Sequence, residues 1–436
     1  MKMTVRSGWL SQTLARAQAA PMIAIAFLTL ATYQASGQTY TTLHAFTGNS
    51  DGGYVLAPVI LDSKGNLYGT TFQGGDMNCA PGQGCGTVFK IDAHGHETVI
   101  YAFTSDIPDA AFPAAGLVRD AFGNLFGTTM EGGAAGIGTI FKVSASGNET
   151  VLYSFKGGKL GAYPTGTIVR DPAGNIYGAG SFGDLNCDPT YSGCGIVFRL
   201  TSAGKFTVLH TFHNIDEDGE DPSGLFRDQS GNLYGTTLLG GDLNCNGGRG
   251  CGTVFKIDPQ GKLTTLYKFH GKDGAFPTSG VIQDSYKNLY GTTSAGTAGV
   301  VFKLDPTGHE TVLYRFAGGA DGGDPEASLL LDPNTGALYG TTMVGGDLSC
   351  SPNGGGGPGC GTVYKIDASG VFTVLYAFTG NPSEFSYAGV VMDRLGNLYG
   401  TTTGIPNCCG NEGSVFRLAP NSTDTPGRPG TAITRP

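Results

Sequence analysis

Four segments of the sequence carry two cysteines shortly after an aspartate, in the pattern Gly-Asp-x-(Asn/Ser)-Cys. Paired cysteines could form disulfides or hold zinc. Disulfides are favoured because the spacings are not Cys-x-x-Cys and each segment offers two thiols rather than four. The predicted bridges lie within the segments: Cys79–Cys85, Cys187–Cys194, Cys245–Cys251 and Cys350–Cys360. For the adjacent Cys408 and Cys409, a vicinal disulfide, free thiols and a bound ligand all remain open.

The aspartate of this pattern has two interpretations. It could fix its loop through an Asx-type turn, or its carboxylate could bind Ca²⁺ or the hydroxyl groups of a ligand. Exposed loop aromatics could stack on sugar rings, although several precede proline and could equally anchor a strand start. The predicted ligand-binding residues are Asp76, Asp184, Asp242, Asp347 and Tyr191. Further loop aromatics are Tyr54, Phe112, Tyr163, Phe276, Phe385 and Tyr387.

The segment "DEDGED" (216–221) places several carboxylates around a glycine, which suits Ca²⁺. It lacks the full twelve-residue EF-hand pattern, and a solvated acidic loop is the alternative. The predicted metal ligands are Asp216, Asp218 and Asp221, with Ca²⁺ as the candidate cofactor. No His-Glu-x-x-His, Gly-x-Ser-x-Gly or phosphate-loop motif occurs, so no catalytic residue is predicted.

A repeated phrase, "GNLYGTT" and its variants, organises the chain. Seven copies occur, with their central glycines at Gly69, Gly127, Gly178, Gly235, Gly291, Gly340 and Gly400. The full repeat carries four strand-like runs, which we name a to d. In the first repeats they are typified by "GLVRD" (116–120), "NLYGTT" (66–71), "GTVFKID" (86–92) and "TVIYAF" (98–103). These runs are rich in β-branched and aromatic residues.

The seventh copy lacks its strand d, whereas the chain begins with a lone run of that type, "YTTLHAF" (40–46). We therefore predict an all-β, seven-bladed β-propeller with four antiparallel strands per blade, whose last blade is completed by strand 40–46. An aspartate ends each strand a and precedes a turn glycine, which predicts turn capping rather than a ring of metal ligands.

Strand direction alternates, so the a–b and c–d turns lie on one face and the b–c and d–a loops on the other. The first set is short and uniform, and the second is long and variable. Variable loops on a rigid scaffold are where binding usually occurs. We therefore predict that the b–c and d–a loops form the functional face.

The N-terminus has the features of a secretory signal peptide, with basic residues before the apolar run "PMIAIAFLTLA" (21–31) and the small residues "ASG" (35–37). An uncleaved anchor is the alternative. The expected parts are a signal peptide (1–37), the propeller (38–419) and a flexible tail (420–436). The net charge of −9 argues against nucleic acid. We expect an exported monomer, periplasmic or extracellular, with no membrane span in the mature chain.

The combined phrase "GNLYGTT…GG…CGTVFKID…G…TVLYAF" resembles the Gloeobacter–Verrucomicrobia (GloVer) tandem repeat of exported bacterial proteins, over about residues 40–419. The resemblance implies a secreted or surface propeller of unassigned activity. Many relatives carry a C-terminal sorting anchor. The segment 421–436 departs from that pattern, having no apolar helix or basic cluster, so we expect release rather than anchoring.

The leading functional prediction is a binding module for extracellular glycan or protein. One alternative is a polysaccharide lyase or hydrolase that uses carboxylates of the loop face. Another is a purely structural envelope protein. Fold alone does not discriminate among these three.

Overall fold

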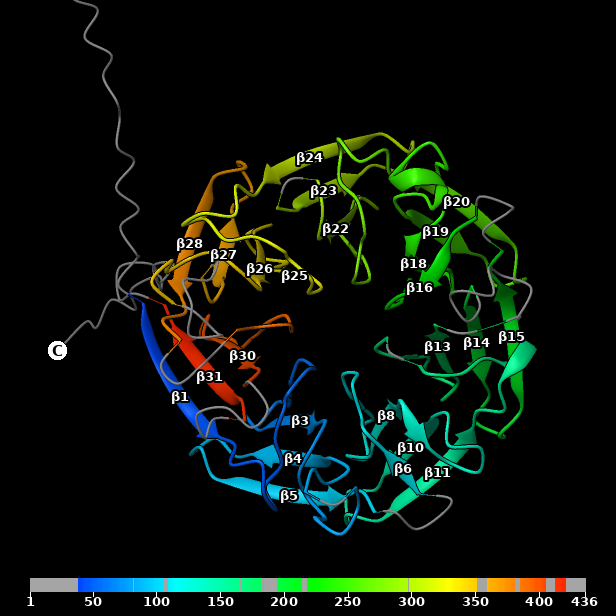
Figure 1. The fold of residues 1–436 in the computed structure, drawn as a ribbon, viewed down its shortest axis with the longest axis vertical. Coiled ribbons are helices and arrows are strands. Elements are labelled where there is room, and N and C mark those ends of the chain that lie inside the picture. Colours follow the sequence, from blue (N-terminus) through cyan, green and yellow to red (C-terminus); the bar gives the residue numbers. More distant parts are fainter. Residues whose placement is uncertain are drawn as a thin grey trace, which may run out of the picture. The chain divides into compact units, whose positions relative to one another are not determined.

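The computed structural model describes residues 38–420, apart from 81, 105–108, 165, 182, 184–193, 214–217, 297, 351–358, 381–384 and 405–411. All of these residues belong to one compact unit, Ala35–Pro436. Within it, seven antiparallel sheets surround a common axis as the blades of a β-propeller (Figure 1). The predicted fold class is therefore confirmed.

Each blade has the same strand order from the axis outward. Strand a is short: β2 (Ile60–Leu61), β7 (Val118–Arg119), β12 (Val169–Arg170), β17 (Phe226–Arg227), β21 (Ile282–Gln283), β25 (Leu330–Leu331) and β29 (Val391–Met392). Strand b carries the repeated phrase: β3 (Leu67–Thr71), β8 (Leu125–Thr129), β13 (Ile176–Gly180), β18 (Leu233–Leu239), β22 (Leu289–Thr293), β26 (Leu338–Thr342) and β30 (Leu398–Thr402).

The two outer strands are equally regular. Strand c comprises β4 (Thr87–Ile91), β10 (Thr139–Val143), β14 (Ile196–Leu200), β19 (Thr253–Ile257), β23 (Val300–Leu304), β27 (Thr362–Ile366) and β31 (Ser414–Ala419). Strand d comprises β5 (Glu97–Ala102), β11 (Glu149–Ser154), β15 (Phe206–Thr211), β20 (Leu263–Lys268), β24 (Glu310–Arg315), β28 (Phe372–Ala377) and β1 (Thr39–Ala45).

Short extra elements extend two of the loops. β6 (Ala110–Ala111) pairs with β9 (Glu131–Gly132), and β16 (Glu220–Pro222) pairs with the long β18. The only helices among the described residues are single 3₁₀ turns, η1 (Gly158–Leu160) and η3 (Asn246–Gly248). Within that part of the chain, no helix has the length and apolar character needed to cross a membrane.

The first strand closes the ring, as predicted. β1 pairs antiparallel with β31, with Tyr40 opposite Leu418 and Ala45 opposite Ser414. The closure continues at the axis, where the hydroxyl of Thr401 donates to the carbonyl of Ala57, 3.0 Å away. The first and last strands therefore form one blade (Figure 1).

The repeated Gly-Thr-Thr has a packing role at each position. A Cβ on Gly69 would lie 2.5 Å from the ring of Phe89, so only glycine allows that ring to pack against strand b. The first threonine reaches the next blade, as when Thr292 donates to the carbonyl of Ala327 at 3.1 Å. The second binds strand c of its own blade, as in Thr71 and Thr87, 2.9 Å apart. The phrase therefore encodes packing within and between blades.

The a–b turns confirm the prediction of turn capping. Asp228 accepts the backbone N–H and the side-chain amide of Asn232, at 2.9 and 2.8 Å, and the hydroxyl of Tyr234 at 3.4 Å. The asparagine of "GNLYG" is thus the partner of the aspartate before it. These hydrogen bonds lower the pKa of the Asp228 carboxyl against the opposing effect of its burial.

Candidate functional site

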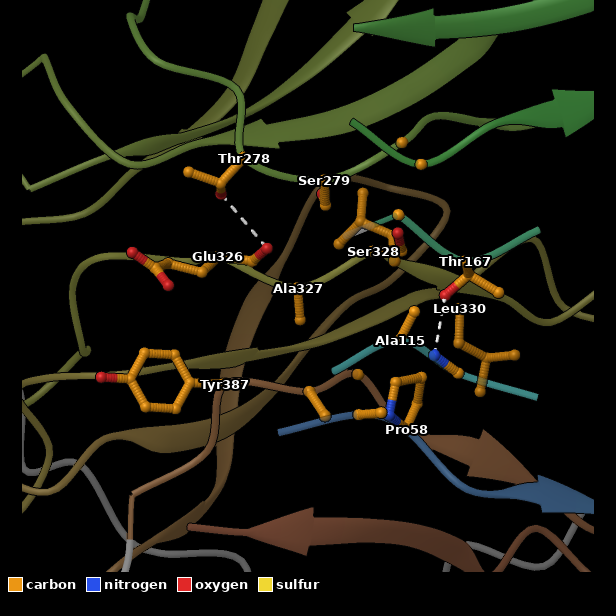
Figure 2. Close-up of a pocket in the computed structure, with 18 of the residues that line it drawn as sticks. Pro58, Ala115, Thr167, Thr278, Ser279, Glu326, Ala327, Ser328, Leu330 and Tyr387 are labelled. Atoms are coloured by element: carbon orange, nitrogen blue, oxygen red, sulfur yellow. Dashed lines mark hydrogen bonds between the residues drawn. The ribbon is translucent and has the colours of Figure 1, made fainter. Parts of the chain in front are cut away.

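A cavity of about 560 Å³ lies on the axis of the propeller. It is lined by the inner segments of all seven blades, so it is the central channel of the ring. Most of its wall is small or apolar, including Ala57, Ala115, Ala327 and Ala388. Larger polar side chains on this wall are few, and Glu326 and Tyr387 are two of them (Figure 2).

Small residues are required on this wall because the inner segments nearly touch. A Cβ on Gly280 would lie 2.4 Å from the carbonyl oxygen of Gly224, and one on Gly166 would lie 3.0 Å from the nitrogen of Gly224. Two further contacts cross between blades: Thr167 accepts the N–H of Gly116, and Thr278 donates to the backbone carbonyl of Glu326 (Figure 2). The channel wall is therefore held by neighbouring blades and preorganised.

One position in the d–a loops has a left-handed backbone although it is never glycine. Its φ is between 49° and 59° at Tyr54, Phe112, Tyr163, Asp221, Phe276 and Asp324. Non-glycine residues adopt this conformation only when the surroundings hold it. Here the N–H of Phe276 donates to the carbonyl of Cys251 in the preceding blade, and its own carbonyl accepts from Ser294. The predicted anchoring role is therefore present in the backbone.

The seventh copy of this position is Phe385. The aromatic residues at this position are unevenly distributed around the ring. Phe385, Tyr54, Phe112 and Tyr163 come from the consecutive blades seven, one, two and three. Tyr54 and Phe72 have ring centroids 5.9 Å apart, and Phe72 and Phe112 are 5.2 Å apart. Blades four and six have Asp221 and Asp324 instead, with Phe276 of blade five between them. The four consecutive blades seven, one, two and three thus form an aromatic arc of the loop face.

Two carboxyls of blade six lie beside this aromatic arc. Burial raises the pKa of Asp324, and burial together with the Asp324 charge raises the pKa of Glu326 to about 7. Burial also raises the pKa of Tyr387, with smaller contributions from Tyr54, Glu326 and Asp324. The four groups are therefore close enough to interact electrostatically. The side chains of Glu326 and Tyr387 project to the same side of the cavity (Figure 2).

These carboxyls lack partners within the part of the chain that the structure describes. There, neither Asp324 nor Glu326 has a side-chain hydrogen bond or an ion pair. Buried carboxyls are normally paired or hydrogen-bonded. We name the group formed by Tyr54, Asp324, Glu326, Phe385 and Tyr387 the channel mouth. Its carboxyls and rings could accept hydrogen bonds from a ligand and contact its apolar surface.

The predicted ligand-binding aspartates of the b–c loops lie apart from the channel mouth in the sequence, and the three that the structure describes each cap their own loop. Asp76 accepts the N–H and side-chain amide of Asn78, both at 2.9 Å, and Asp347 accepts the N–H and hydroxyl of Ser349. Asp242 does the same with Asn244 and lies 3.8 Å from Nε2 of His270. Asp184 and Tyr191 lie outside the described residues.

The predicted Ca²⁺ ligands have separate partners where they are described. Asp218 accepts from Nε2 of His210 at 2.7 Å and from the N–H of His213 at 3.1 Å. The carboxyl of Asp221 is bonded to the hydroxyl of Ser181, and burial raises its pKa. Asp216 lies outside the described residues. Among the residues described, no three His, Cys, Asp or Glu side chains are grouped so as to hold a metal ion.

The cysteine loops form disulfides. Bridges join Cys79 to Cys85, Cys245 to Cys251 and Cys350 to Cys360, with Cα–Cα distances of 5.6, 5.6 and 5.7 Å. Cys194 is also disulfide-bonded, and its predicted partner Cys187 lies outside the described residues, as do Cys408 and Cys409.

A second set of carboxyls lies at the blade junctions and has no counterpart among the predicted sites. Glu97, Glu149 and Glu310 begin strands d, and a side-chain oxygen of each is buried without a hydrogen-bond partner in the described structure. Burial raises the pKa of all three to about 7, with help from the charges of Asp51, Asp109 and Asp273 respectively.

Other blades place an aromatic ring at the same strand position. Phe206 stacks on Tyr153 with ring centroids 4.0 Å apart, and Phe372 stacks on Tyr314 at 3.8 Å. The first residue of strand d therefore contacts the outer strand of the preceding blade. The junctions therefore differ: some are aromatic stacks, others hold a half-buried glutamate near an aspartate, and strand d of blade four begins with Leu263.

Sequence reasoning missed Asp324 and Glu326 as site residues, although it named the aromatics around them. The signal was an alignment of the d–a loops on their proline. It shows an aromatic residue at the position of Asp324 in five blades, Asp221 in blade four, and Asp324 in blade six, where Glu326 follows after the proline.

Comparison with known proteins agrees with the fold. No curated protein matches the chain. Two solved extracellular domains from B. thetaiotaomicron, described as parts of a hybrid two-component and a one-component system, are each 13% identical. Their TM-scores are 0.53 and 0.51; they cover 87% and 88% of this chain but only 39% and 40% of their own. A gluconolactonase from Xanthomonas campestris is 11% identical, with a TM-score of 0.43 and coverage of 89% and 91%. The likeness to the two B. thetaiotaomicron domains concerns the fold alone.

The family model of the Gloeobacter/Verrucomicrobia repeat matches residues 29–245, 186–351 and 246–426, which overlap and span all seven blades. The matched segments contain the Gly-Thr-Thr phrase, the capped a–b turns and the closing strand that build this propeller. The chain therefore belongs to the Gloeobacter/Verrucomicrobia repeat family.

Proposed function

We propose that this protein is an exported binding module that takes a glycan at the channel mouth, on the face formed by the b–c and d–a loops. The observation that carries the proposal is the juxtaposition of aromatic rings with two carboxyls that have no partner among the described residues. Sugar rings offer an apolar face for stacking and hydroxyls that donate to carboxylates. A protein partner is the alternative ligand.

Export is supported by the disulfides, which persist in oxidising compartments. It is also supported by the signal-like segment 1–37, after which we place the mature chain. We propose that the protein acts as a monomer, in the periplasm or outside the cell, and that 420–436 is a tail with no part in binding.

The test is binding of the purified 38–436 protein to a panel of polysaccharides, with and without EDTA. Bound glycan is then analysed by mass spectrometry. We expect at least one glycan to be retained intact. Loss of binding in EDTA would support a Ca²⁺ site on the loop face. Failure of every glycan to bind would overturn the proposal and favour a protein partner or a structural role.

A matched pair of variants locates the site. Tyr387→Ala removes a ring of the channel mouth, and loss of a stacking contact is expected to weaken binding about tenfold. Tyr286→Ala is the control, because Tyr286 is 81% exposed on an a–b turn of the opposite face. Equal binding by both variants, with unchanged melting temperatures, would exclude the channel mouth.

A polysaccharide lyase or hydrolase is the second candidate, favoured by one observation. A carboxyl whose pKa is about 7, as for Glu326, can hold a proton near neutral pH, which a general acid requires. Asp324 and the hydroxyl of Tyr387 provide further groups of the kind that glycan cleavage uses. Shortened glycans in the mass spectra, absent with Glu326→Gln, would replace the binding proposal with this one.

A further inference from the structure

The channel mouth combines a cavity, aromatic rings and negative charge, and this combination limits the kind of glycan that fits. The inference rests on the proposed function, because it concerns the ligand of the same site. The cavity is large enough for a sugar residue and is walled mainly by small apolar side chains. Its chemical selectivity must therefore come from the few polar groups at its mouth.

Within the described part of the chain, no basic side chain pairs with the carboxyls of the channel mouth. No lysine or arginine is among the groups that perturb the pKa of Asp324 or Glu326, and each carboxyl lacks an ion pair among the described residues. Elsewhere the chain does supply cations to its carboxyls: Arg170 lies 3.9 Å from Asp120, and Lys287 acts on Asp228. The junction glutamates Glu97 and Glu149 also lack a nearby cation, but Glu326, unlike them, lines the axial cavity.

The aromatic groups beside the carboxyls also favour a ligand with a positive charge. Tyr387 and Phe385 have ring centroids 5.4 Å apart, and Tyr54 lies within electrostatic range of Tyr387. Aromatic faces attract cations through the ring quadrupole, most strongly where water is partly excluded. A neutral sugar would use the rings but leave the two carboxyls repelling each other, and an acidic sugar would add a third negative charge.

We propose that the channel mouth selects a glycan bearing free amino groups, with a sugar ammonium placed between the carboxyls of Asp324 and Glu326 and its ring against Tyr387. The ammonium has three donors, enough to bond both carboxylates and screen their mutual repulsion. An N-acetylated sugar of the same backbone keeps the apolar ring face but loses the charge, so it provides a matched comparison.

The experiment measures binding of the 38–436 protein to a β-1,4-linked glucosamine pentamer and to its fully N-acetylated form by calorimetry. We expect the amino form to bind at least about tenfold more tightly, which is the gain of one charge-assisted hydrogen bond over a neutral one. The preference should shrink as NaCl is raised from about 50 to about 500 mM. Equal affinities for the two pentamers would overturn the proposal.

Variants assign the preference to the two carboxyls. Glu326→Gln and Asp324→Asn should each reduce binding of the amino pentamer and leave the N-acetylated pentamer unchanged. Glu131→Gln is the control, because Glu131 is an exposed acid of blade two outside the channel mouth. A preference that survives the double variant would overturn the proposal. So would tighter binding of pentalysine than of the amino pentamer, because the cationic occupant would then be a peptide.

Failure here is distinguishable from failure of the proposed function. Binding of neutral glycans without any advantage for the amino form would reject the ammonium site and keep the glycan-binding module. Absence of binding by either pentamer and by the whole polysaccharide panel would reject both.

Discussion

The two ends of the inner strands carry carboxyls with opposite surroundings. At the a–b turns, aspartates are surrounded by donors: the carboxyl of Asp228 accepts three hydrogen bonds, and its pKa is lowered. At the channel mouth, Glu326 and Asp324 have no side-chain partner among the described residues, and their pKa values are raised. The same chemical group stabilises the fold at one end and is available to a ligand at the other.

The comparison also shows how a repeat separates structure from function. The a–b aspartate recurs in every blade because every blade needs its turn. Glu326 is a glutamate in blade six alone, and Asp324 shares its position only with Asp221 of blade four, where the other five blades have an aromatic residue. Departures from the repeat, rather than the repeat itself, therefore indicate the candidate site.

The largest expected effect is that of removing a turn carboxyl. Asp228→Ala should lower the free energy of unfolding by about 3 kcal/mol, because it leaves the half-buried amide of Asn232 and the buried hydroxyl of Tyr234 without an acceptor. Urea titration at pH 7 measures the change. Glu326→Gln is the counterpart and should leave stability unchanged or slightly higher, since it removes a charge that has no partner. Equal destabilisation by the two variants would contradict the contrast between carboxyls with and without hydrogen-bond partners.

The blade-junction glutamates predict a smaller effect that depends on pH. The pKa of Glu97, Glu149 and Glu310 is raised from 4.5 to about 7 in the folded protein. Between these values the folded state holds protons that the unfolded state has lost. The free energy of unfolding should therefore fall as pH rises from about 4.5 to about 7, and then become constant.

The turn aspartates have the opposite sign. A lowered pKa, as for Asp228, contributes stability that is present above its unfolded value of 3.8 and is lost as the pH falls through the lower folded value. Unfolding by urea across pH 3 to 8 should thus give a maximum near pH 4 to 5. The triple variant Glu97→Gln, Glu149→Gln, Glu310→Gln should flatten the limb above the maximum and leave the acid limb intact. If the triple variant still loses stability above the maximum, these glutamates are not the source of that pH dependence.

The fold could be predicted from the sequence because its determinants are local and repeated. "GNLYGTT" encodes a strand with a glycine for the strand-c ring, and the missing seventh strand d could be inferred by counting runs. The disulfide loops and the capped turns are likewise short-range features, with partners within ten residues in the sequence. Such contacts leave a pattern that can be read without coordinates.

The candidate site could not be predicted in the same way, because its parts are far apart in the sequence. Tyr54 and Glu326 belong to blades one and six, and only closure of the ring brings them within electrostatic range of Tyr387. The junction carboxyls have the same origin, since Glu97 is perturbed by Asp51 of the loop before its own blade. The left-handed φ of Asp324 is also set by contacts between blades.

The smallest expected effect concerns a polar group without a partner in the core of one blade. Strand c carries a phenylalanine against the strand-b glycine in every blade except blade six, which has Tyr364. The Tyr364 side chain is fully buried, and its hydroxyl has no hydrogen-bond partner among the described residues. Tyr364→Phe should therefore raise the free energy of unfolding by about 1 kcal/mol, the cost of an unsatisfied buried hydroxyl. Thermal and urea unfolding measure the change.

Phe302→Tyr in blade five is the reciprocal variant and should destabilise by a similar amount, because that site already holds the ring without room for a donor. A destabilised Tyr364→Phe protein would mean that the hydroxyl is bonded after all, and that blade six differs from the others in its core as well as at its mouth.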